Sequence, residues 1–368
     1  MKKITLLLLV LLMVISACKK DETPAPYPGS SFEVVINDIP FPTEKFMRIP
    51  YTIKTWEYEK DGLQLQKIIV LDNDSKNELF TIMSDDFRRI YKEPIPTTPL
   101  FDWDKLTHYY LSIQLPIPLS QEIPTQVSHQ FIFRDTIDNK DVTMDGGLFS
   151  PRKGEHPIVI ASPLKSERNL LINQSTLGYH FDVLFFLDGE IYTPERFAFD
   201  QLRLDSTFTN YFIGDPTVNE SYINYRDTLY AVADGTVNFI QDGMLENSGN
   251  LHDAPLVTAN DFGGNYLVLE IGSGLYAYYC HVVPNSFLVN TGDEINEGDP
   301  IGLIGNSGNS DAPHLHFHIS DGTDLFRATG VPFVLKSYTK IGNYETGLIT
   351  PEVIENAMME EMTLINFY

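Results

Sequence analysis

Short runs of apolar residues, most of them without helical spacing, dominate the first half of the chain. Between Phe32 and Pro151 these runs either alternate apolar and polar side chains or are apolar throughout, and turn signals separate them. Alternation with period two places every second side chain on the same face of a strand. Many short strands with regular turns predict a β-sandwich over residues 32–151. The runs that indicate strands are 32–36, 51–58, 65–71, 109–115 and 127–133.

A second β-rich unit is expected over residues 172–337, where glycine-rich turns separate further apolar runs. Within it, residues 201–228 are rich in Asn, Asp and Thr, and they predict a long irregular loop. A loop of that length in a compact domain is often functional, and this one is expected to flank any cleft.

The C-terminal extension, residues 338–368, carries the signals of a short helix. Thr350 suits the N-cap, Pro351 suits the first helical position, and acidic residues follow in the early turns. The expected fold class is therefore all-β: an N-terminal β-sandwich, an antiparallel β-domain with a groove, and a short C-terminal helix.

The first 18 residues have the form of an export signal. Two lysines precede an uninterrupted apolar run over residues 4–15, which is too short to span a bilayer as a mature helix. Small residues then lead into Cys18, and the segment resembles a lipobox, whose cysteine becomes the acylated N-terminus of a lipoprotein. The alternative is an ordinary signal peptide with an incidental cysteine.

The lipobox resemblance implies a place in the bacterial cell envelope. Lipid attached to Cys18 would anchor the chain to a membrane, facing either the periplasm or the cell surface. Residues 19–31, which are polar and contain three prolines, read as the tether between the lipid and the fold.

Composition narrows the range of partners. The formal net charge is −24 at pH 7, and so acidic a surface repels phosphate backbones, which argues against nucleic acid as a partner. Besides Cys18 the chain contains only Cys280, so acylation of Cys18 would leave no intramolecular disulfide. Cys280 lies in an apolar run, and we interpret it as a buried small hydrophobe rather than a nucleophile.

The segment 306–319 carries the strongest chemical signal. A loop rich in Gly, Asn and Ser ends at a proline, and an alternating strand then places His314, His316 and His318 on one face and apolar residues on the other. Three imidazoles on one face form a plausible wall for a metal ion, since a catalytic zinc takes imidazole nitrogen and carboxylate oxygen as ligands and keeps one position open.

This segment is similar to the signature of the lysostaphin/LytM-type zinc endopeptidases, which cut peptide cross-links in bacterial peptidoglycan. The likeness spans roughly residues 180–325 and includes 230–237, 265–270, 276–281 and 292–302. The resemblance implies a LytM-type peptidase domain over residues 172–337, Zn2+ as cofactor, and peptidoglycan peptides as substrate.

Carried over position by position, the resemblance assigns roles to four residues. It implies that His316 and Asp200 ligate zinc, and that His281 and His314 form the unligated catalytic pair that orients and deprotonates water. The first motif of the family is His-x-x-x-Asp, but here Arg196 stands four residues before Asp200. An arginine has no lone pair to offer a metal, so the ligand set is one short.

His180 is the candidate substitute for the missing ligand. Residues 181–186 and 191–200 read as a hairpin, and a three-residue loop at 188–190 would place His180 on the same face as Asp200. A strict two-residue turn would place it on the other face. The alternative is that His180 is an ordinary strand residue and that Arg196 forms a salt bridge with Asp200, closing a dead site.

Three further histidines are interpreted separately. His318 is an uncertain site residue that could be a second-shell donor, an extra ligand or a solvated strand residue. His156 and His252 lie near expected loops and are interpreted as surface histidines.

Two functional hypotheses from different classes follow. In the first the chain is a zinc endopeptidase acting on peptidoglycan, which the intact His281, His314, His316 and Asp200 favour. In the second, favoured by Arg196, it is a catalytically degenerate domain that binds the cell wall or regulates another hydrolase as a protein partner.

The lipobox gives the first testable prediction. Changing Cys18→Ala should release the chain from the membrane fraction, because no acyl chain would be attached, and fractionation with mass spectrometry of the mature N-terminus measures this. A mature protein that is cleaved elsewhere and carries an unmodified Cys18 would contradict the prediction.

Overall fold

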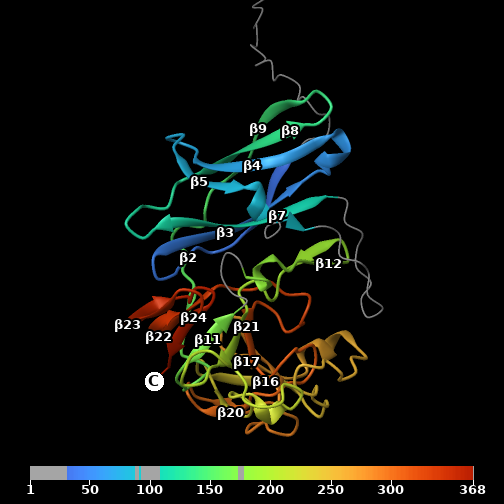
Figure 1. Ribbon diagram of the computed structural model, residues 1–368, viewed down its shortest axis with the longest axis vertical. Helices are drawn as coiled ribbons and strands as arrows, with labels where there is room; N and C mark the ends of the chain where they lie inside the picture. Colours follow the sequence, from blue (N-terminus) through green and yellow to red (C-terminus); the bar gives the residue numbers. More distant parts are fainter. Residues whose placement is uncertain (1–30, 88–90, 93–107, 173–177, 368) are drawn as a thin grey trace, which may run out of the picture.

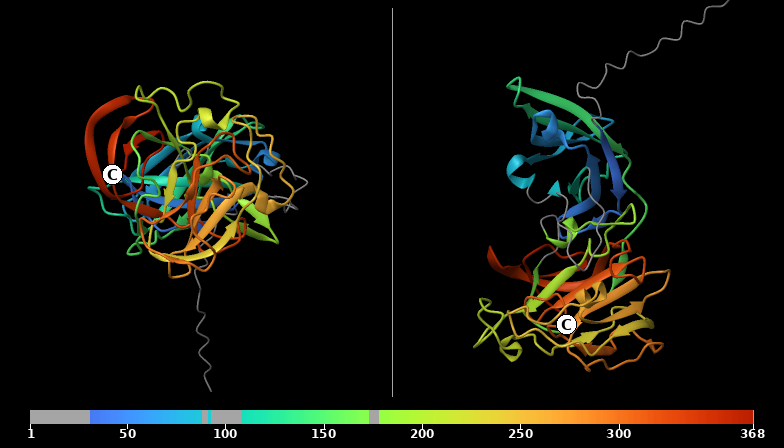
Figure 2. Two further views of the ribbon diagram at one scale, coloured as in Figure 1. Left: turned by 90° about the horizontal axis from the view of Figure 1, so that it is seen from below. Right: turned by 90° about the vertical axis from the view of Figure 1, so that its right-hand side faces the viewer.

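The computed structural model describes residues 31–87, 91–92, 108–172 and 178–367, which form two β-rich lobes stacked end to end (Figures 1 and 2). The expected signal peptide, Cys18 and the tether as far as residue 30 lie outside the described residues. In the described ranges the helices are short 3-10 turns, and none is long and apolar enough to cross a membrane. These turns are η1 (Tyr58–Asp61), η2 (Ser84–Asp86), η3 (His180–Asp182), η4 (Asn219–Ser221) and η5 (Ala259–Gly263).

The N-terminal lobe consists of two antiparallel sheets, as the alternating pattern predicted. Its first sheet has the order β1-β3-β7-β6 with β2 paired to β3, and its second has the order β5-β4-β8-β9. The strands are β1 (Phe32–Asn37), β2 (Phe41–Pro42), β3 (Phe46–Thr55), β4 (Leu63–Asp72), β5 (Glu78–Met83), β6 (Tyr91–Lys92), β7 (Tyr109–Pro118), β8 (Val127–Asp135) and β9 (Lys140–Phe149).

Period-two burial builds the core between these sheets. Along β8 every second residue is buried, and the fully buried Phe131 and Phe133 face Ile49 and Ile53 of β3 within one hydrophobic cluster. Each such side chain contributes roughly 1.5–3 kcal/mol of transfer free energy when it leaves water.

The C-terminal lobe is organised around one large sheet with the order β10-β22-β24-β11-β14-β21-β18-β17-β16-β19, to which β23 adds at β22. Two short pairs, β12–β13 and β15–β20, lie outside this sheet. The large sheet contains β10 (Ile158–Ile160), β11 (Asn169–Ile172), β14 (Phe199–Arg203), β16 (Gly235–Gln241), β17 (Asn265–Glu270), β18 (Tyr276–Val282), β19 (Glu294–Ile295), β21 (Leu315–Ser320), β22 (Phe333–Asn343), β23 (Gly347–Ala357) and β24 (Thr363–Asn366). The short pairs are β12 (Phe185–Leu187) with β13 (Glu190–Tyr192), and β15 (Thr228–Tyr230) with β20 (Pro300–Leu303).

Both faces of the large sheet are covered at its centre. On β21 the apolar residues Leu315, Phe317 and Ile319 are fully buried in the main core of the lobe. On the opposite face, Tyr278 and Cys280 of β18 belong to a second cluster that also includes residues of the β12–β13 hairpin. The face of β21 that carries its histidines is therefore covered by other parts of the protein and shielded from bulk water.

The predicted C-terminal helix is wrong. Residues 347–357 form strand β23, which pairs with β22, and residues 363–366 form β24 between β22 and β11. The ladder between β22 and β23 shifts register between the pairs Gly342↔Leu348 and Lys340↔Glu352, and Pro351 lies in this irregular stretch. A proline is tolerated in a strand at such a bulge or on an edge, so Thr350-Pro351 marks an irregular edge strand rather than a helix start.

An aromatic contact joins the two lobes. Phe41 of β2 is only 1% exposed, belongs to the main core of the C-terminal lobe, and contacts Phe197 edge to face with ring centroids 5.6 Å apart. An ion pair between Arg48 and Glu360, with an N–O distance of 2.7 Å, also crosses the junction.

Phe41 supplies a test of this junction. Phe41→Ala should lower the free energy of unfolding by about 3–5 kcal/mol, because it leaves a cavity among buried side chains. Phe80→Ala is the matched control, since Phe80 is 38% exposed on β5 and should cost much less. Denaturant titration of both variants measures the difference, and equal losses would contradict the account of the junction.

Candidate metal centre

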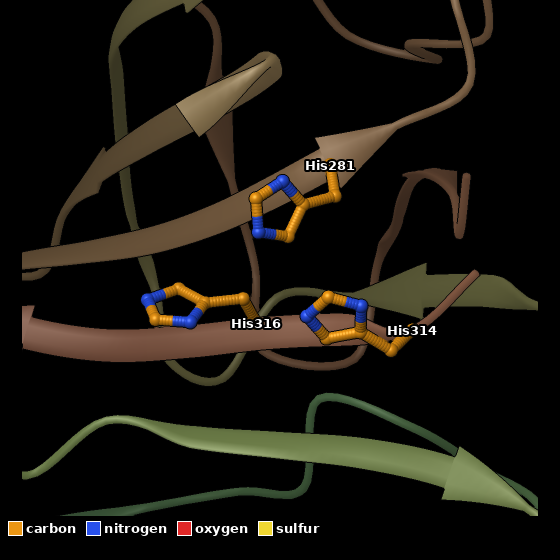
Figure 3. A group of neighbouring side chains, drawn as sticks. All are labelled: His281, His314 and His316. Carbon is orange, nitrogen blue, oxygen red and sulfur yellow. The ribbon is translucent and has the colours of Figure 1, made fainter. Parts of the chain in front are cut away.

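Three neighbouring strands bring the candidate residues together. Asp200 of β14 lies directly opposite His316 of β21, and His316 in turn lies opposite Cys280 of β18. His281 follows Cys280, and His314 precedes β21 by one residue. Residues that are far apart in the sequence therefore meet at one point of the sheet, where the imidazole rings of His281, His314 and His316 lie in one group (Figure 3).

A bulge in β18 turns His281 toward the centre. The ladder between β17 and β18 passes from Leu267↔Tyr279 to Asn265↔Val282, so β18 carries one extra residue there. His281 has φ of +63°, a left-handed conformation that is uncommon for any residue but glycine. Its Nδ1 lies 2.8 Å from the carbonyl oxygen of Ser307, and this contact assigns the proton to Nδ1 and leaves the lone pair on Nε2.

His314, the residue just before β21, also carries its proton on Nδ1. Its Nδ1 lies 2.7 Å from the carbonyl oxygen of Ala312, to which it donates, and its Nε2 lies 3.5 Å from Oδ1 of Asp200. The ring centroids of His314 and His281 are 4.8 Å apart. The two imidazoles thus present their Nε2 atoms from adjacent strands.

The loop before His314 is held by side-chain amides that sequence reasoning did not single out. Asn247 donates from its amide to the carbonyl oxygens of Asn306, Gly308 and Ser310 at 2.9–3.1 Å. The Ser310 hydroxyl donates to the Asn306 side chain at 2.8 Å. Their only sequence signal was the composition of the loop, since Asn247 lies far from it in the chain.

His180 reaches the centre, but not by the predicted route. The β12–β13 hairpin has a strict two-residue turn at Asp188-Gly189, with Leu187 opposite Glu190, so the three-residue loop that would have brought His180 to the face of Asp200 is not formed. His180 lies in the 3-10 turn η3 instead of on a strand, and the register of the hairpin therefore does not fix its direction. Its Nε2 lies 3.1 Å from Oδ2 of Asp200.

Arg196 does not contact Asp200, so the predicted salt bridge that would close the site is wrong. The arginine side chain is fully buried, and its Nε donates to Oδ2 of Asp38 in the N-terminal lobe at 2.6 Å. Asp200 is instead in contact with Nε2 of His180 and with Nδ1 of His316, the latter at 2.9 Å.

Glu195 is a member of the centre that the sequence analysis did not identify. Its Oε2 lies 3.5 Å from Nδ1 of His180, on the side of the ring opposite Asp200. Burial raises the pKa of Glu195, but the hydrogen bond from His180 and the neighbouring imidazoles outweigh it and lower the pKa to about 2. Burial lowers the pKa of His180, and Asp200 and Glu195 together outweigh it and raise the pKa to about 10.

His318 is fully buried, so the solvated interpretation of this residue is wrong. Its Nδ1 lies 3.1 Å from Nε2 of His316, and its ring stacks on Tyr278 with centroids 4.5 Å apart. Burial, with the nearby His316, lowers the pKa of His318 to about 3, so the ring is neutral. The neutral ring of His318 accepts a hydrogen bond from Nε2 of His316. Nδ1 of His316 then keeps the lone pair that could ligate a metal ion.

His156 and His252 are exposed, as predicted, and Cys280 is buried.

Two overlapping sets of donor atoms could hold a metal ion, and His316 belongs to both. One set is His180, Asp200 and His316, and the other is His281, His314 and His316, each with ligand atoms within 4.8 Å of one another. Ligand atoms of a tetrahedral zinc site lie about 3.3 Å apart, given metal–ligand bonds of about 2.0–2.2 Å. The contacts of 3.1 and 2.9 Å from Asp200 are close to that spacing.

The first set fits a divalent cation better because it contains a carboxylate. Burial raises the pKa of Asp200, but His180 and His314 outweigh it and hold the pKa well below its usual range, so the group is ionised. A buried anion with two imidazole nitrogens is the donor chemistry that zinc prefers. The residues present therefore fit the metal that the sequence resemblance implied.

The comparison with known families agrees with this geometry. Residues 222–327 match Peptidase family M23, a stretch that includes His281, His314 and His316 but neither Asp200 nor His180. Peptidoglycan DD-endopeptidase ShyA of Vibrio cholerae is 36% identical over 141 residues, which are 36% of this chain and 30% of that protein. Peptidoglycan DD-endopeptidase ShyC of the same organism is 31% identical over 94 residues, or 25% of this chain and 19% of that protein.

Solved structures give a weaker likeness. The catalytic domain of the antimicrobial peptidase lysostaphin from Staphylococcus simulans is 22% identical with a TM-score of 0.23, covering 33% of this chain and 84% of that one. Residues 222–327 thus match the model of Peptidase family M23, and part of the chain is similar to two peptidoglycan DD-endopeptidases. The chain spans less than a third of the length of ShyA and of ShyC.

The two donor sets make opposite predictions for zinc binding. If His180, Asp200 and His316 hold the metal, His180→Ala should weaken zinc binding more than ~100-fold, since loss of a ligand exceeds the usual effect of a second-shell change. His281→Ala should change it by no more than about threefold. Competition with a chelating dye measures both constants. The reverse order of effects would assign the metal to the three-histidine set.

Proposed function

We propose that this chain is a zinc-dependent endopeptidase that hydrolyses peptide bonds in peptidoglycan at the bacterial cell envelope. The observation that carries the proposal is the convergence of His180, Asp200 and His316 beside the pair His281 and His314. The homologous domain of ShyA and ShyC supports peptidoglycan as the substrate class, because both proteins are named for that activity.

In this proposal His180, Asp200 and His316 hold the zinc ion. A bound zinc ion supplies a Lewis acid that polarises a peptide carbonyl and makes water more acidic. Glu195 and His318 contact the far ring nitrogens of His180 and His316 at 3.5 and 3.1 Å, and these contacts orient the two rings toward Asp200.

His281 and His314 carry the proton transfers. Each donates its Nδ1 proton to a backbone carbonyl, so its Nε2 is available to accept a proton from the attacking water. The imidazole that takes the proton from water can then return it to the leaving amine as the C–N bond breaks, while the other, in its protonated form, can donate a hydrogen bond to the oxyanion. Two rings 4.8 Å apart can divide these tasks between the two sides of a scissile bond.

The hypothesis of a degenerate domain rested on Arg196 neutralising Asp200. Arg196 bonds Asp38 instead, and imidazoles surround Asp200. No described contact therefore favours a closed, metal-free centre, and the enzyme remains the proposal.

The envelope location rests on the sequence. Acylation of Cys18 would anchor the chain to a membrane through the polar tether, with the lobes facing the periplasm or the cell surface. An anchored hydrolase of this kind reaches only the wall within the length of its tether.

The test is digestion of purified peptidoglycan by the full chain, with the released fragments identified by mass spectrometry. The parent should release peptide fragments, lose this activity with a chelator and regain it with zinc. His281→Ala should reduce the turnover rate by roughly 10²–10⁴-fold, the usual contribution of a general base. His156→Ala is the control, since His156 is exposed and lies outside the centre. A parent that binds no zinc and releases no peptide would replace the enzyme with the regulatory hypothesis.

A further inference from the structure

The segment that carries His180 and Glu195 is not part of the large sheet. His180 lies in η3 and Glu195 follows the β12–β13 hairpin, and neither pairs with a strand of that sheet. Asp200 and His316, by contrast, are fixed by the β14–β21 ladder. Backbone hydrogen bonds join the segment to residues 328–330 at Thr193, which is distant in sequence from His180, so the position of His180 depends on side-chain packing as well.

The N-terminal lobe supplies much of that packing. On one side of the segment, Phe185 and Leu187 pack against the sheet of the C-terminal lobe. On the other side, Leu184 and Phe186 are buried against Tyr110 of β7, with Val35 and Ile36 of β1 alongside them. Figure 1 shows β12 between the two lobes. The segment is held between the lobes rather than by the C-terminal lobe alone.

Arg196 links the N-terminal lobe to the turn that bears His180. Its Nε donates to Asp38 at 2.6 Å, its Nη1 donates to the carbonyl oxygen of Phe181 at 3.3 Å, and its guanidinium carbon lies 4.0 Å from the centroid of the Phe181 ring. Phe181 is the next residue after His180, and Arg196 is the next residue after Glu195. The guanidinium therefore contacts the residue next to His180 and is itself the side chain of the residue next to Glu195.

From these contacts we infer that the N-terminal lobe is a structural part of the metal centre, and that the buried Asp38–Arg196 pair positions His180 as a ligand and Glu195 as its partner. The inference rests on the proposed function, since it concerns the same zinc ion. Asp38 and Arg196 are positioning residues, because neither touches the ligand atoms. Arg196 stands where the related family has a ligand. Here it supports the turn that carries the replacement ligand, His180.

The closest structural alternative is that Asp38–Arg196 only joins the lobes. The chain offers a matched control for that role in the Arg48–Glu360 pair, which also crosses the junction and is also largely buried, with N–O distances of 2.7 and 2.9 Å. Its acidic partner, Glu360, precedes β24 and lies outside the His180 segment. A change there tests the cost of losing a junction ion pair without touching the ligand turn.

The experiment compares Asp38→Asn, Arg196→Met and Glu360→Gln in the full chain purified in detergent. Zinc affinity is measured by competition with a chelating dye, ligand geometry by the visible absorption of bound cobalt(II), and thermal stability in the metal-free state. Asp38→Asn and Arg196→Met should weaken zinc binding about 10- to 100-fold, which is the usual effect of losing a residue that orients a metal ligand. Both changes should also alter the cobalt spectrum. Glu360→Gln should leave both unchanged while lowering the melting temperature.

A double variant, Asp38→Leu with Arg196→Met, covers the case in which Arg196→Met does not fold, since it leaves no unpaired buried charge. Parent-like zinc affinity and cobalt spectrum in this folded double variant would overturn the inference while leaving the proposed function intact. A parent chain that binds no zinc would instead overturn the proposed function, and the inference with it.

Discussion

The buried carboxylate of Asp200 is the constraint that the rest of the centre must satisfy. An ionised carboxylate out of water is costly unless opposite charge and hydrogen bonds surround it. The side chain is 9% exposed, and its oxygens contact Nε2 of His180 and Nδ1 of His316. In the metal-free chain, the raised pKa of His180 favours its protonated ring, which supplies compensating charge. A metal ion would take the place of that proton, so that binding releases a proton and strengthens as pH rises.

Several parts of this arrangement could be predicted from sequence because their signals are local. The alternation of His314, His316 and His318 with apolar residues fixes one face of a strand, whatever the rest of the fold does. The resemblance to a peptidase family then pointed to His281, at the end of a matching segment, and to Asp200, at the aspartate position of the family's first motif. The strands of the N-terminal lobe followed from the same period-two pattern.

The failures share a different cause, which is that distant packing decides them. Arg196 bonds Asp38, which lies 158 positions earlier, and no local pattern indicates that pair. His180 was reached by counting ligands, but the hairpin register could not place it, because the residue lies in a 3-10 turn outside the hairpin. Thr350-Pro351 has the residues of a helix start, and pairing with β22 overrides that preference.

Asp200 and His180 are held in the centre in two different ways, one by a strand and the other by a turn. A strand residue such as Asp200 is held by ladder hydrogen bonds on both sides, from β11 and from β21. A turn residue such as His180 depends on contacts made after the sheet has formed. The two residues therefore differ in how firmly they are held, and we expect the turn of His180 to open more readily than the strand of Asp200.

The place of β24 in the large sheet has a consequence for the order of events when the chain folds. Residues 363–366 lie between β22 and β11, and Asn169 pairs with Ile365 across roughly 200 intervening residues. Until those late residues are available, β11 lacks a neighbour on one side and the strand beside it, β14, has an incomplete support. Such long-range closure is slow compared with the pairing of adjacent strands. A chain that emerges N-terminus first would therefore leave β14 without its full support until nearly all residues were available, and Asp200 would reach its place among the imidazoles only then.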